Sequence, residues 1–313
     1  LFAQNSATAT DTYNTAVGAL AGAEVTTGTQ NTIVGGLAAD ALTTGFQNVA
    51  IGVDALSTDT AGNKSVAVGR SALATQNFTS DTDGLNVAVG YFAGAGVTTG
   101  IQNTLIGGQA GQALTDADDN VAIGPFALKN DTLGSNSVAI GRSALGDQNF
   151  TTATDAYNVG VGYFAGVALT TGTVNTLIGG GAGEKITTGG GNVIIGYTAG
   201  AHNVYLTTGS RNVIIGVQAD STTAGQTDSN VIGHNVSGAG GYTTLGNAGS
   251  DIRALHGNIT WATVSDERYK KDIVDSEAGL SLINALRPRT FKYKTLGELP
   301  ETFRAYEEGS TKV

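Results

Sequence analysis

The sequence predicts an all-β fold: a repetitive parallel β-roll or β-solenoid with coils of about 17 residues and a super-repeat of 72 residues. Three observations lead to this prediction. A strand-like box recurs at near-constant spacing, a longer period is superimposed on it, and the 313 residues include 47 Gly, 3 Pro and only 13% charged residues. Because Val, Ile, Leu and Thr recur in register, the chain does not have a disordered composition. Gly is not every third residue, which excludes collagen.

The recurring box has the form Asn-Val-Ala-Ile-Gly, with Ser sometimes replacing Asn. Its starts are Asn14, Asn31, Asn48, Ser65, Asn86, Asn103, Asn120, Ser137, Asn158, Asn175, Asn192, Asn212 and Asn230. The steps between starts are 17, 17, 17, 21, 17, 17, 17, 21, 17, 17, 20 and 18 residues, and each set of four sums to 72. Such a fixed short period predicts a solenoid, in which each coil is stabilised by stacking on its neighbours.

A single coil, residues 86–102, shows how the elements follow one another. Val87 and Val89 alternate with Ala88, so the two valines share one face of a short strand. The box glycine permits a turn with positive φ, and the Thr-Thr-Gly at 98–100 forms a second turn. One coil offers too few inward side chains to offset an ordering entropy of roughly 1–2 kcal/mol per residue. A stack of about thirteen coils can offset it, and since its core is thin, we expect an oligomer.

Charge divides the chain and excludes several classes of protein. Residues 1–264 hold 7 Lys+Arg and 17 Asp+Glu, whereas residues 265–313 hold 9 of each. An acidic shaft repels a phosphate backbone, so we expect no nucleic-acid partner. No apolar run approaches the roughly 20 residues of a membrane span, so we expect no membrane insertion. The chain begins at Leu1 rather than Met, and we expect a fragment or a processed product.

The recurrent Asn has two interpretations. It could present a row of amides that bind sugars, or it could form an internal ladder that satisfies backbone groups of the turns. Stacked β structures commonly use such ladders, and we favour this interpretation.

The two 21-residue coils each add four residues, at 76–79 and 148–151, one super-repeat apart. Extra residues in a solenoid are extruded as loops, which tend to carry binding. The Phe of each loop could stack on a sugar ring while Gln and Asn supply hydrogen bonds. Alternatively, and in our preferred interpretation, the Phe folds back over a neighbouring coil or chain. The candidate receptor contacts are Gln76, Asn77, Phe78, Gln148, Asn149 and Phe150.

The shaft carries no motif for a metal or a cofactor. Asp116, Asp118 and Asp119 form the densest acidic cluster, but the Gly and distal Glu of a calcium loop are absent, which predicts a solvated turn. The three histidines lack zinc-ligand spacing, there is no Cys, and no phosphate-loop or dinucleotide motif follows a Gly run. We therefore expect a non-enzymatic shaft, although a paired-carboxylate glycosidase site stays open.

The boxes at 65–69 and 136–141, Ser-Val-Ala-Val-Gly and Asn-Ser-Val-Ala-Ile-Gly, resemble the head repeats of trimeric autotransporter adhesins. The resemblance covers roughly residues 14–250, with a longer repeat than is usual in that family. It implies a left-handed parallel β-roll that assembles as a homotrimer. The repeated pairs Tyr91-Phe92 and Tyr163-Phe164 are then expected in an inter-chain seam.

The sequence changes character after residue 264. Residues 265–273 read Ser-Asp-Glu-Arg-Tyr-Lys-Lys-Asp-Ile, an amphipathic run at 278–288 predicts a short helix, and an alternating run at 290–294 predicts a strand. This small α+β segment resembles the C-terminal intramolecular chaperone of phage tail spikes, tail fibres and endosialidases. The resemblance implies a domain that trimerises three chains, guides the shaft to fold and then cuts itself off.

The same resemblance assigns the cleavage chemistry. Ser265 would be the nucleophile, Lys270 its general base, and Val264–Ser265 the scissile bond. A Lys whose pKa is lowered by burial can deprotonate a Ser hydroxyl, and the reaction would be a single turnover in cis. The alternative is a Ser cap followed by a solvated charge run.

We therefore expect four parts: a lead-in at 1–13, a β-roll shaft at 14–250, a connector at 251–264 and a partial chaperone domain at 265–313. The leading functional hypothesis is the homotrimeric shaft of a phage tail fibre or spike, in the virion tail and extracellular. It would mediate or position attachment to a host cell-surface glycan or protein receptor. Other tail or appendage proteins would bind through a preceding part. The alternatives are an adhesin or filament on the bacterial cell surface, and a polysaccharide-degrading tail spike.

Overall fold

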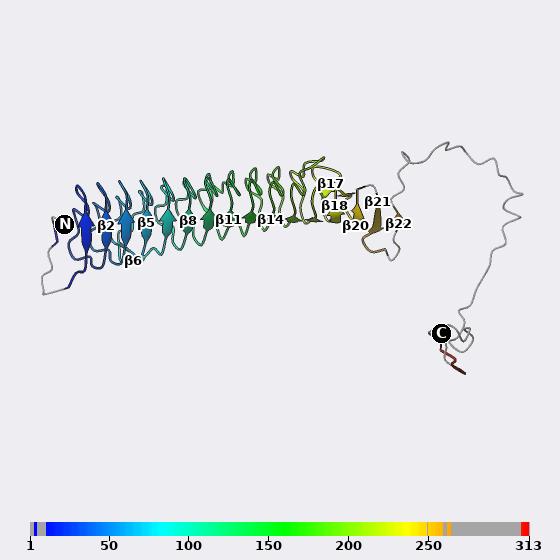
Figure 1. Ribbon diagram of the computed structural model, residues 1–313, viewed down its shortest axis with the longest axis horizontal. Coiled ribbons are helices and arrows are strands. Elements are labelled where there is room, and N and C mark those ends of the chain that lie inside the picture. Colours follow the sequence, from blue (N-terminus) through cyan, green and yellow to red (C-terminus); the bar gives the residue numbers. More distant parts are fainter. Residues whose placement is uncertain (1–2, 5–10, 249, 259–261, 264–307, 313) are drawn as a thin grey trace, which may run out of the picture. The chain divides into compact units, whose positions relative to one another are not determined.

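The computed structural model describes residues 3–4, 11–248, 250–258, 262–263 and 308–312. The chain divides into two units, Leu1–Val264 and Ser265–Val313, and the strands that the structure describes belong to the first (Figure 1). All the regular elements among the described residues are strands, which confirms the all-β prediction. The helix and strand expected within 278–294, together with Ser265 and Lys270, lie outside the described residues.

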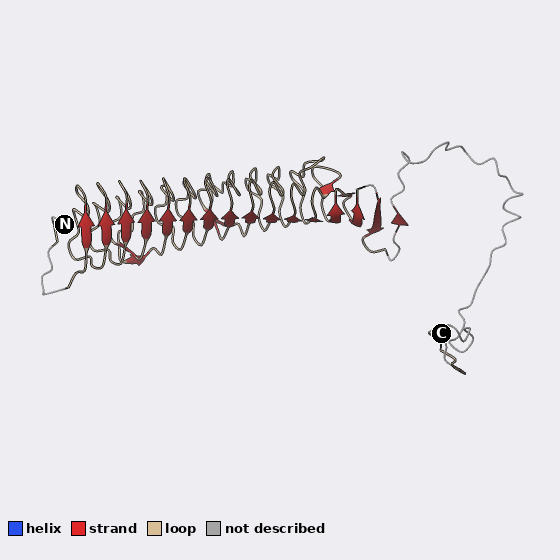
Figure 2. Ribbon diagram, viewed as in Figure 1, coloured by secondary structure: helices blue, strands red, loops and turns tan. Residues whose placement is uncertain are grey.

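One 16-stranded sheet runs along the first unit, and Figure 2 shows its strands in a single row. In spatial order its strands are β1 (Thr15–Val17), β2 (Thr32–Val34), β3 (Val49–Ile51), β5 (Val66–Val68), β7 (Val87–Val89), β8 (Thr104–Ile106), β9 (Val121–Ile123), β11 (Val138–Ile140), β13 (Val159–Val161), β14 (Thr176–Ile178), β15 (Val193–Ile195), β16 (Val213–Ile215), β18 (Asn230–His234), β20 (Tyr242–Asn247), β21 (Ser250–Leu255) and β22 (Ala262–Thr263). Every pairing from β1 to β20 is parallel, so the chain is a β-solenoid, as predicted.

Three two-stranded parallel sheets lie outside the main sheet. They pair β4 (Gly62–Asn63) with β6 (Thr82–Asp83), β10 (Gly134–Ser135) with β12 (Thr154–Asp155), and β17 (Asp220–Ser221) with β19 (Ser237–Gly238). In the first two pairs, the second strand follows the inserted residues of a 21-residue coil and pairs with a strand of the preceding coil.

Every three-residue strand after β1 buries its middle residue. In β7, Ala88 is fully buried, while Val87 and Val89 are half-buried on the outer face of the sheet. The two valines share a face, as predicted, but the core side chain is the small one between them. Because strand side chains alternate in direction, the β-branched rows point away from the core along the whole sheet.

In most coils two core positions compensate in size. Where the strand centre is small, as at Ala50, the corner six residues later is Leu56, which adopts the left-handed conformation and is fully buried. Where the strand centre is Leu105, the corner is Gly111, and a Cβ there would meet the Leu105 side chain. In the coils of Ala88 and Gly160 both positions are small, and Leu side chains of neighbouring coils fill the space beside Gly94 and Gly166. Large and small side chains thus interdigitate to keep the interior dense.

The box glycine is required by close stacking of the coils. Gly35 has a φ of +141°, and a Cβ at this position would meet the carbonyl oxygen of Gly52 in the next coil. Gly90, whose φ is +144°, has the same relation to Gly107. Only a residue without a side chain permits this conformation and this approach.

The register of the last coil differs from the prediction. Val213 pairs with Asn230 and Ile214 with Val231, so the residue that follows Asn212 in the ladder is Ser229, not Asn230. The third super-repeat is consequently one residue shorter than the other two. The sequence pattern was misleading because Asn230 occupies the outward strand position that Val or Thr fills elsewhere.

The solenoid ends in antiparallel structure. β21 pairs antiparallel with β20, and β22 with β21. Part of the segment expected as a connector, residues 251–264, therefore belongs to the main sheet.

Candidate functional site

The recurrent Asn forms a buried ladder along the shaft. Asn103 donates from Nδ2 to the carbonyl oxygen of Ala117, at 2.8 Å, and its Oδ1 accepts from the backbone N–H of Asn120, at 3.1 Å. Each Asn thus ties its own Thr-Thr-Gly-type turn to the start of the next coil. The fully buried members are Asn31, Asn48, Asn86, Asn103, Asn120, Asn158, Asn175, Asn192 and Asn212. The ladder interpretation is confirmed, and these amides do not face a ligand.

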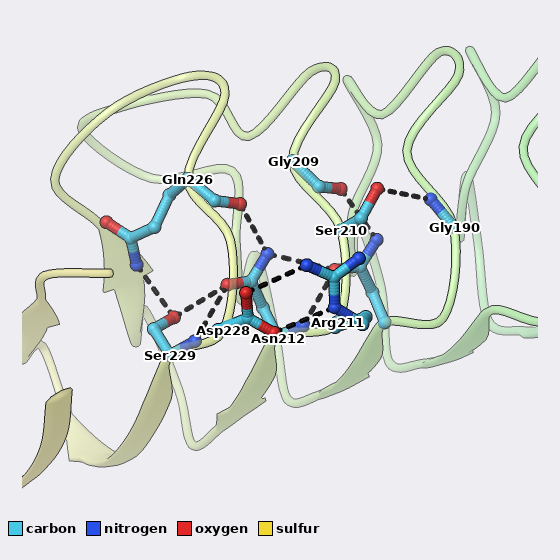
Figure 3. Close-up of polar contacts among 9 residues, drawn as sticks. Gly190, Gly209, Ser210, Arg211, Asn212, Gln226, Asp228 and Ser229 are labelled. Atoms are coloured by element: carbon cyan, nitrogen blue, oxygen red, sulfur yellow. Dashed lines mark hydrogen bonds and ion pairs between the residues drawn. The ribbon is translucent and has the colours of Figure 1, made fainter. Parts of the chain in front are cut away.

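Figure 3 shows the end of this ladder, where Ser replaces Asn. Asn212 donates to the carbonyl oxygen of Gln226, at 2.7 Å, and its Oδ1 accepts from the Oγ of Ser229, at 2.8 Å. The Gln226 side chain in turn donates from Nε2 to the Ser229 Oγ, at 2.7 Å. A Gln side chain thus supplies the amide that Ser lacks.

The same substitution occurs at Ser65, the start of the first 21-residue coil. The Nε2 of Gln76 donates to the Oγ of Ser65, at 3.2 Å, and to the Oδ2 of Asp59, at 2.7 Å. Its Oε1 accepts from the Nδ2 of Asn86, at 2.9 Å. The inserted Gln76 is fully buried and carries the ladder across the position where Asn is absent.

Asp59 is the centre of this buried network. Its Oδ1 accepts from the backbone N–H groups of Phe78 and Gly62, at 3.0 and 3.1 Å. Burial raises the pKa of the Asp59 carboxyl above its ordinary value of 3.8, and hydrogen bonds from Gln76, Phe78, Gly62 and Thr60 oppose that rise. A buried carboxylate needs such donors to stay charged.

The Phe78 side chain covers this buried network. Only 6% of its surface is exposed, and its ring lies against Gly62 and Gly84, where a Cβ would be 2.7 and 2.9 Å from ring carbons. Asn77 is half-buried and accepts a hydrogen bond from the Thr60 hydroxyl, at 3.3 Å. Within one chain, therefore, the Phe folds back over neighbouring coils.

The second 21-residue coil repeats the arrangement. Gln148 donates to Asp131 and Ser137, at 2.6 and 3.1 Å, and accepts from Asn158, at 3.0 Å. Phe150 is 6% exposed, and its N–H donates to Asp131, at 3.0 Å.

Burial of the side chain argues against a receptor contact for most of the six candidate residues. Gln76, Phe78, Gln148 and Phe150 are buried, and among the six only Asn149 is exposed. The sequence carried a signal for the network, because an Asp stands six residues before and a Gln eleven residues after the Ser in both super-repeats.

The remaining predicted features have structural or surface positions. Asp118 accepts from the backbone N–H of Ile101, at 2.8 Å, and Asp116 accepts from the Thr99 hydroxyl. Tyr91 and Tyr163, expected in an inter-chain seam, are about half exposed in the single chain. Over the part of the chain that the structure describes, no three His, Cys, Asp or Glu side chains are grouped to hold a metal. No helix among these residues has the length and apolarity to cross a membrane.

Comparison with known proteins assigns the C-terminal segment. Residues 265–309 match the family model described as the chaperone of endosialidase. The chain therefore combines a β-solenoid shaft with a C-terminal segment similar to an intramolecular chaperone. Neither the comparison with curated proteins nor that with solved structures yields a match.

Proposed function

We propose that this chain is the shaft of a homotrimeric phage tail fibre or spike, located in the virion tail and extracellular, and that it positions or mediates attachment to the host surface. The observation that carries the proposal is the endosialidase-chaperone match at 265–309, directly after a β-solenoid unit that ends at Val264. Parallel stacked coils with near-identical repeats can slip in register. A terminal segment that joins three chains first would remove that ambiguity.

The outer face of the sheet supports a trimer. The third residue of many strands is an aliphatic side chain exposed by between 37% and 59%, and these residues form one row along the shaft. Its most exposed members are Val17, Ile51, Ile106, Ile140, Ile178 and Ile232. A continuous apolar row of this length is unfavourable in water and is typical of an interface. Packing three copies along this row would also bury the outer face of the sheet and so add a second apolar layer to the thin core of each chain.

We further propose that Ser265 and Lys270 perform one self-cleavage. The Ser265 hydroxyl would attack the Val264 carbonyl carbon while Lys270 accepts its proton. The Val264–Ser265 C–N bond would then break as Lys270 returns the proton to the Ser265 nitrogen, and water would hydrolyse the Val264 ester left on the Ser265 oxygen, freeing the Val264 carboxylate and the Ser265 hydroxyl. Loss of the chaperone would leave a shaft that unfolds slowly, since the element that nucleated it is gone. Mass spectrometry of Ser265→Ala tests this: the variant should keep the full 31.4 kDa, while wild type and a Ser281→Ala control release a fragment ending at Val264. An intact wild-type chain would contradict the proposal.

Immunogold labelling with an antibody against residues 1–264, imaged on whole native material, tests the fibre assignment. Gold along the appendages of tailed particles is the expected result. Gold on cell envelopes or free filaments, with none on virions, would overturn it in favour of a bacterial adhesin. Depolymerase activity of the purified shaft on host polysaccharide would instead indicate the third alternative, a polysaccharide-degrading spike.

A further inference from the structure

A small surface pocket lies where the last two coils of the second super-repeat meet the first coil of the third. Its volume is about 200 Å³, less than the roughly 300–1,000 Å³ of pockets that hold drug-sized ligands. It therefore suits one small ring. The lining residues follow β9, β11 and β13, and they are Phe126, Lys129, Asn130, Ser143, Gly146, Asp147 and Val167.

The lining combines an aromatic ring with several hydrogen-bonding groups. Phe126 is half-buried, and the Nζ of Lys129 lies 5.3 Å from its ring centroid. The Nδ2 of Asn130 donates to the Oδ1 of Asp147, at 3.1 Å. The second oxygen of the Asp147 carboxylate, the carbonyl of Asn130 and the Ser143 hydroxyl can accept or donate further hydrogen bonds. Among the described residues, Lys129 makes no salt bridge.

The first super-repeat provides an internal comparison. Seventy-two residues earlier, the positions of Phe126, Lys129 and Asp147 carry Asp54, Ser57 and Thr75. The backbone is equivalent: Phe126 N–H donates to Gly108 at 3.0 Å, and Asp54 N–H to Gly36 at 3.1 Å. Stacking of the coils therefore accepts either set of side chains, and the fold does not require the set that lines the pocket.

The frame of the pocket is fixed by hydrogen bonds between coils. The N–H of Asn130 donates to the Gly146 carbonyl, at 3.2 Å, and the N–H of Asp147 to the Val167 carbonyl, at 3.0 Å. A ligand would therefore meet a preformed site and would not have to order a loop, which lowers the entropic cost of binding.

We propose that this pocket binds one pyranose ring of a host-surface glycan. The apolar C–H face of the sugar would displace the Lys129 ammonium from the Phe126 ring and pack there, while Asp147 and Asn130 bind adjacent hydroxyls and Lys129 donates to a third oxygen. An aromatic body with a polar rim suits a ligand that is apolar on its face and polar at its edge. The proposal extends the host-attachment role given under Proposed function to a particular ligand class and rests on that role.

The test is saturation-transfer NMR on the full chain with D-glucose, D-galactose, D-mannose and N-acetyl-D-glucosamine at millimolar concentration. The test variant, Phe126→Asp, Lys129→Ser and Asp147→Thr combined, restores the residues of the first super-repeat and keeps the backbone that already accommodates them. The control, Tyr157→Leu, is also a swap to the first super-repeat, at the exposed position equivalent to Leu85. Wild type and control should bind at least one of these sugars, and the triple variant about tenfold or more weakly.

Equal binding by the triple variant, or no binding of any of the four sugars by wild type, would overturn the pocket assignment. In that case, labelling of virions by the antibody against residues 1–264 would still support the fibre function. Sugar binding that depends on the three residues, without labelling of virions, would instead support the pocket and contradict the phage assignment.

Discussion

The 17-residue coils and the 21-residue coils close their polar interiors by different means. In the former, one Asn reaches a turn carbonyl and accepts from the next coil, as Asn103 does. In the latter, the shorter Ser65 cannot reach both, and Asp59, Gln76 and Phe78 complete the connection. The comparison shows that a buried ladder can lose one amide only if another chain segment supplies the missing donors and acceptors.

The largest effect should come from removing the Asp59 carboxylate, which the preceding coil supplies to the 21-residue coil. Asp59→Ala leaves the Gln76 Nε2 with one acceptor fewer and the N–H groups of Phe78 and Gly62 without their carboxylate partner in a buried site. We expect a loss of about 3–5 kcal/mol in the free energy of unfolding. Thermal and denaturant unfolding of the variant measure it, with the exposed Asp116→Ala as the control. A loss no greater than that of the control would show that the network is dispensable.

Breaking the Asn ladder in a 17-residue coil should lower the free energy of unfolding by somewhat less. Asn103→Ala removes the donor to the Ala117 carbonyl and the acceptor for the Asn120 N–H, so two buried backbone groups lose their partners. The expected loss is about 2–4 kcal/mol. Amide hydrogen exchange should report faster exchange in the adjacent coils than in distant ones. The exposed Asn149→Ala should leave exchange unchanged, and equal protection in both variants would refute the ladder's role.

The smallest effect concerns pH. Because burial raises the pKa of Asp59 above 3.8, the folded chain takes up this proton at a higher pH than the unfolded chain does. The group therefore adds stability as the pH falls from above its raised pKa toward 3.8, and that contribution is lost as the pH rises again. The Asp59→Asn variant has no ionisable group at this position, so its stability lacks this dependence on pH. The difference in Tm between wild type and variant should shift in favour of wild type on acidification, and a difference independent of pH would contradict the assignment.

Much of the fold could be predicted because each coil repeats the same few requirements. An apolar residue or Gly at the strand centre, a glycine at the close approach and an Asn or Ser at the ladder are visible as a period. The register at Asn230 could not be predicted from the box alone, since hydrogen bonding rather than residue type distinguishes it from Ser229.

The Asp59 network was harder to predict because the hydrogen bonds that Gln76 and Phe78 make to Asp59 and Ser65 span 11 to 19 residues and form only when coils stack. Gln76 and Phe78 stood out as an insertion, and an insertion predicts a surface loop. In the folded chain, the same residues are drawn inward because Asp59 and Ser65 need partners. The residues of the pocket at Phe126 become distinctive only when the two super-repeats are compared position by position.

The proposed function depends on assembly of the shaft into a trimer by the C-terminal segment. The most direct measurement is sedimentation equilibrium of the shaft produced with residues 265–313 and of the shaft produced with a stop codon after Val264. We expect a particle with the mass of three shafts from the first and no such particle from the second, although both products contain the same coils. A trimer of the same mass from the truncated gene, or a monomer from both, would contradict it.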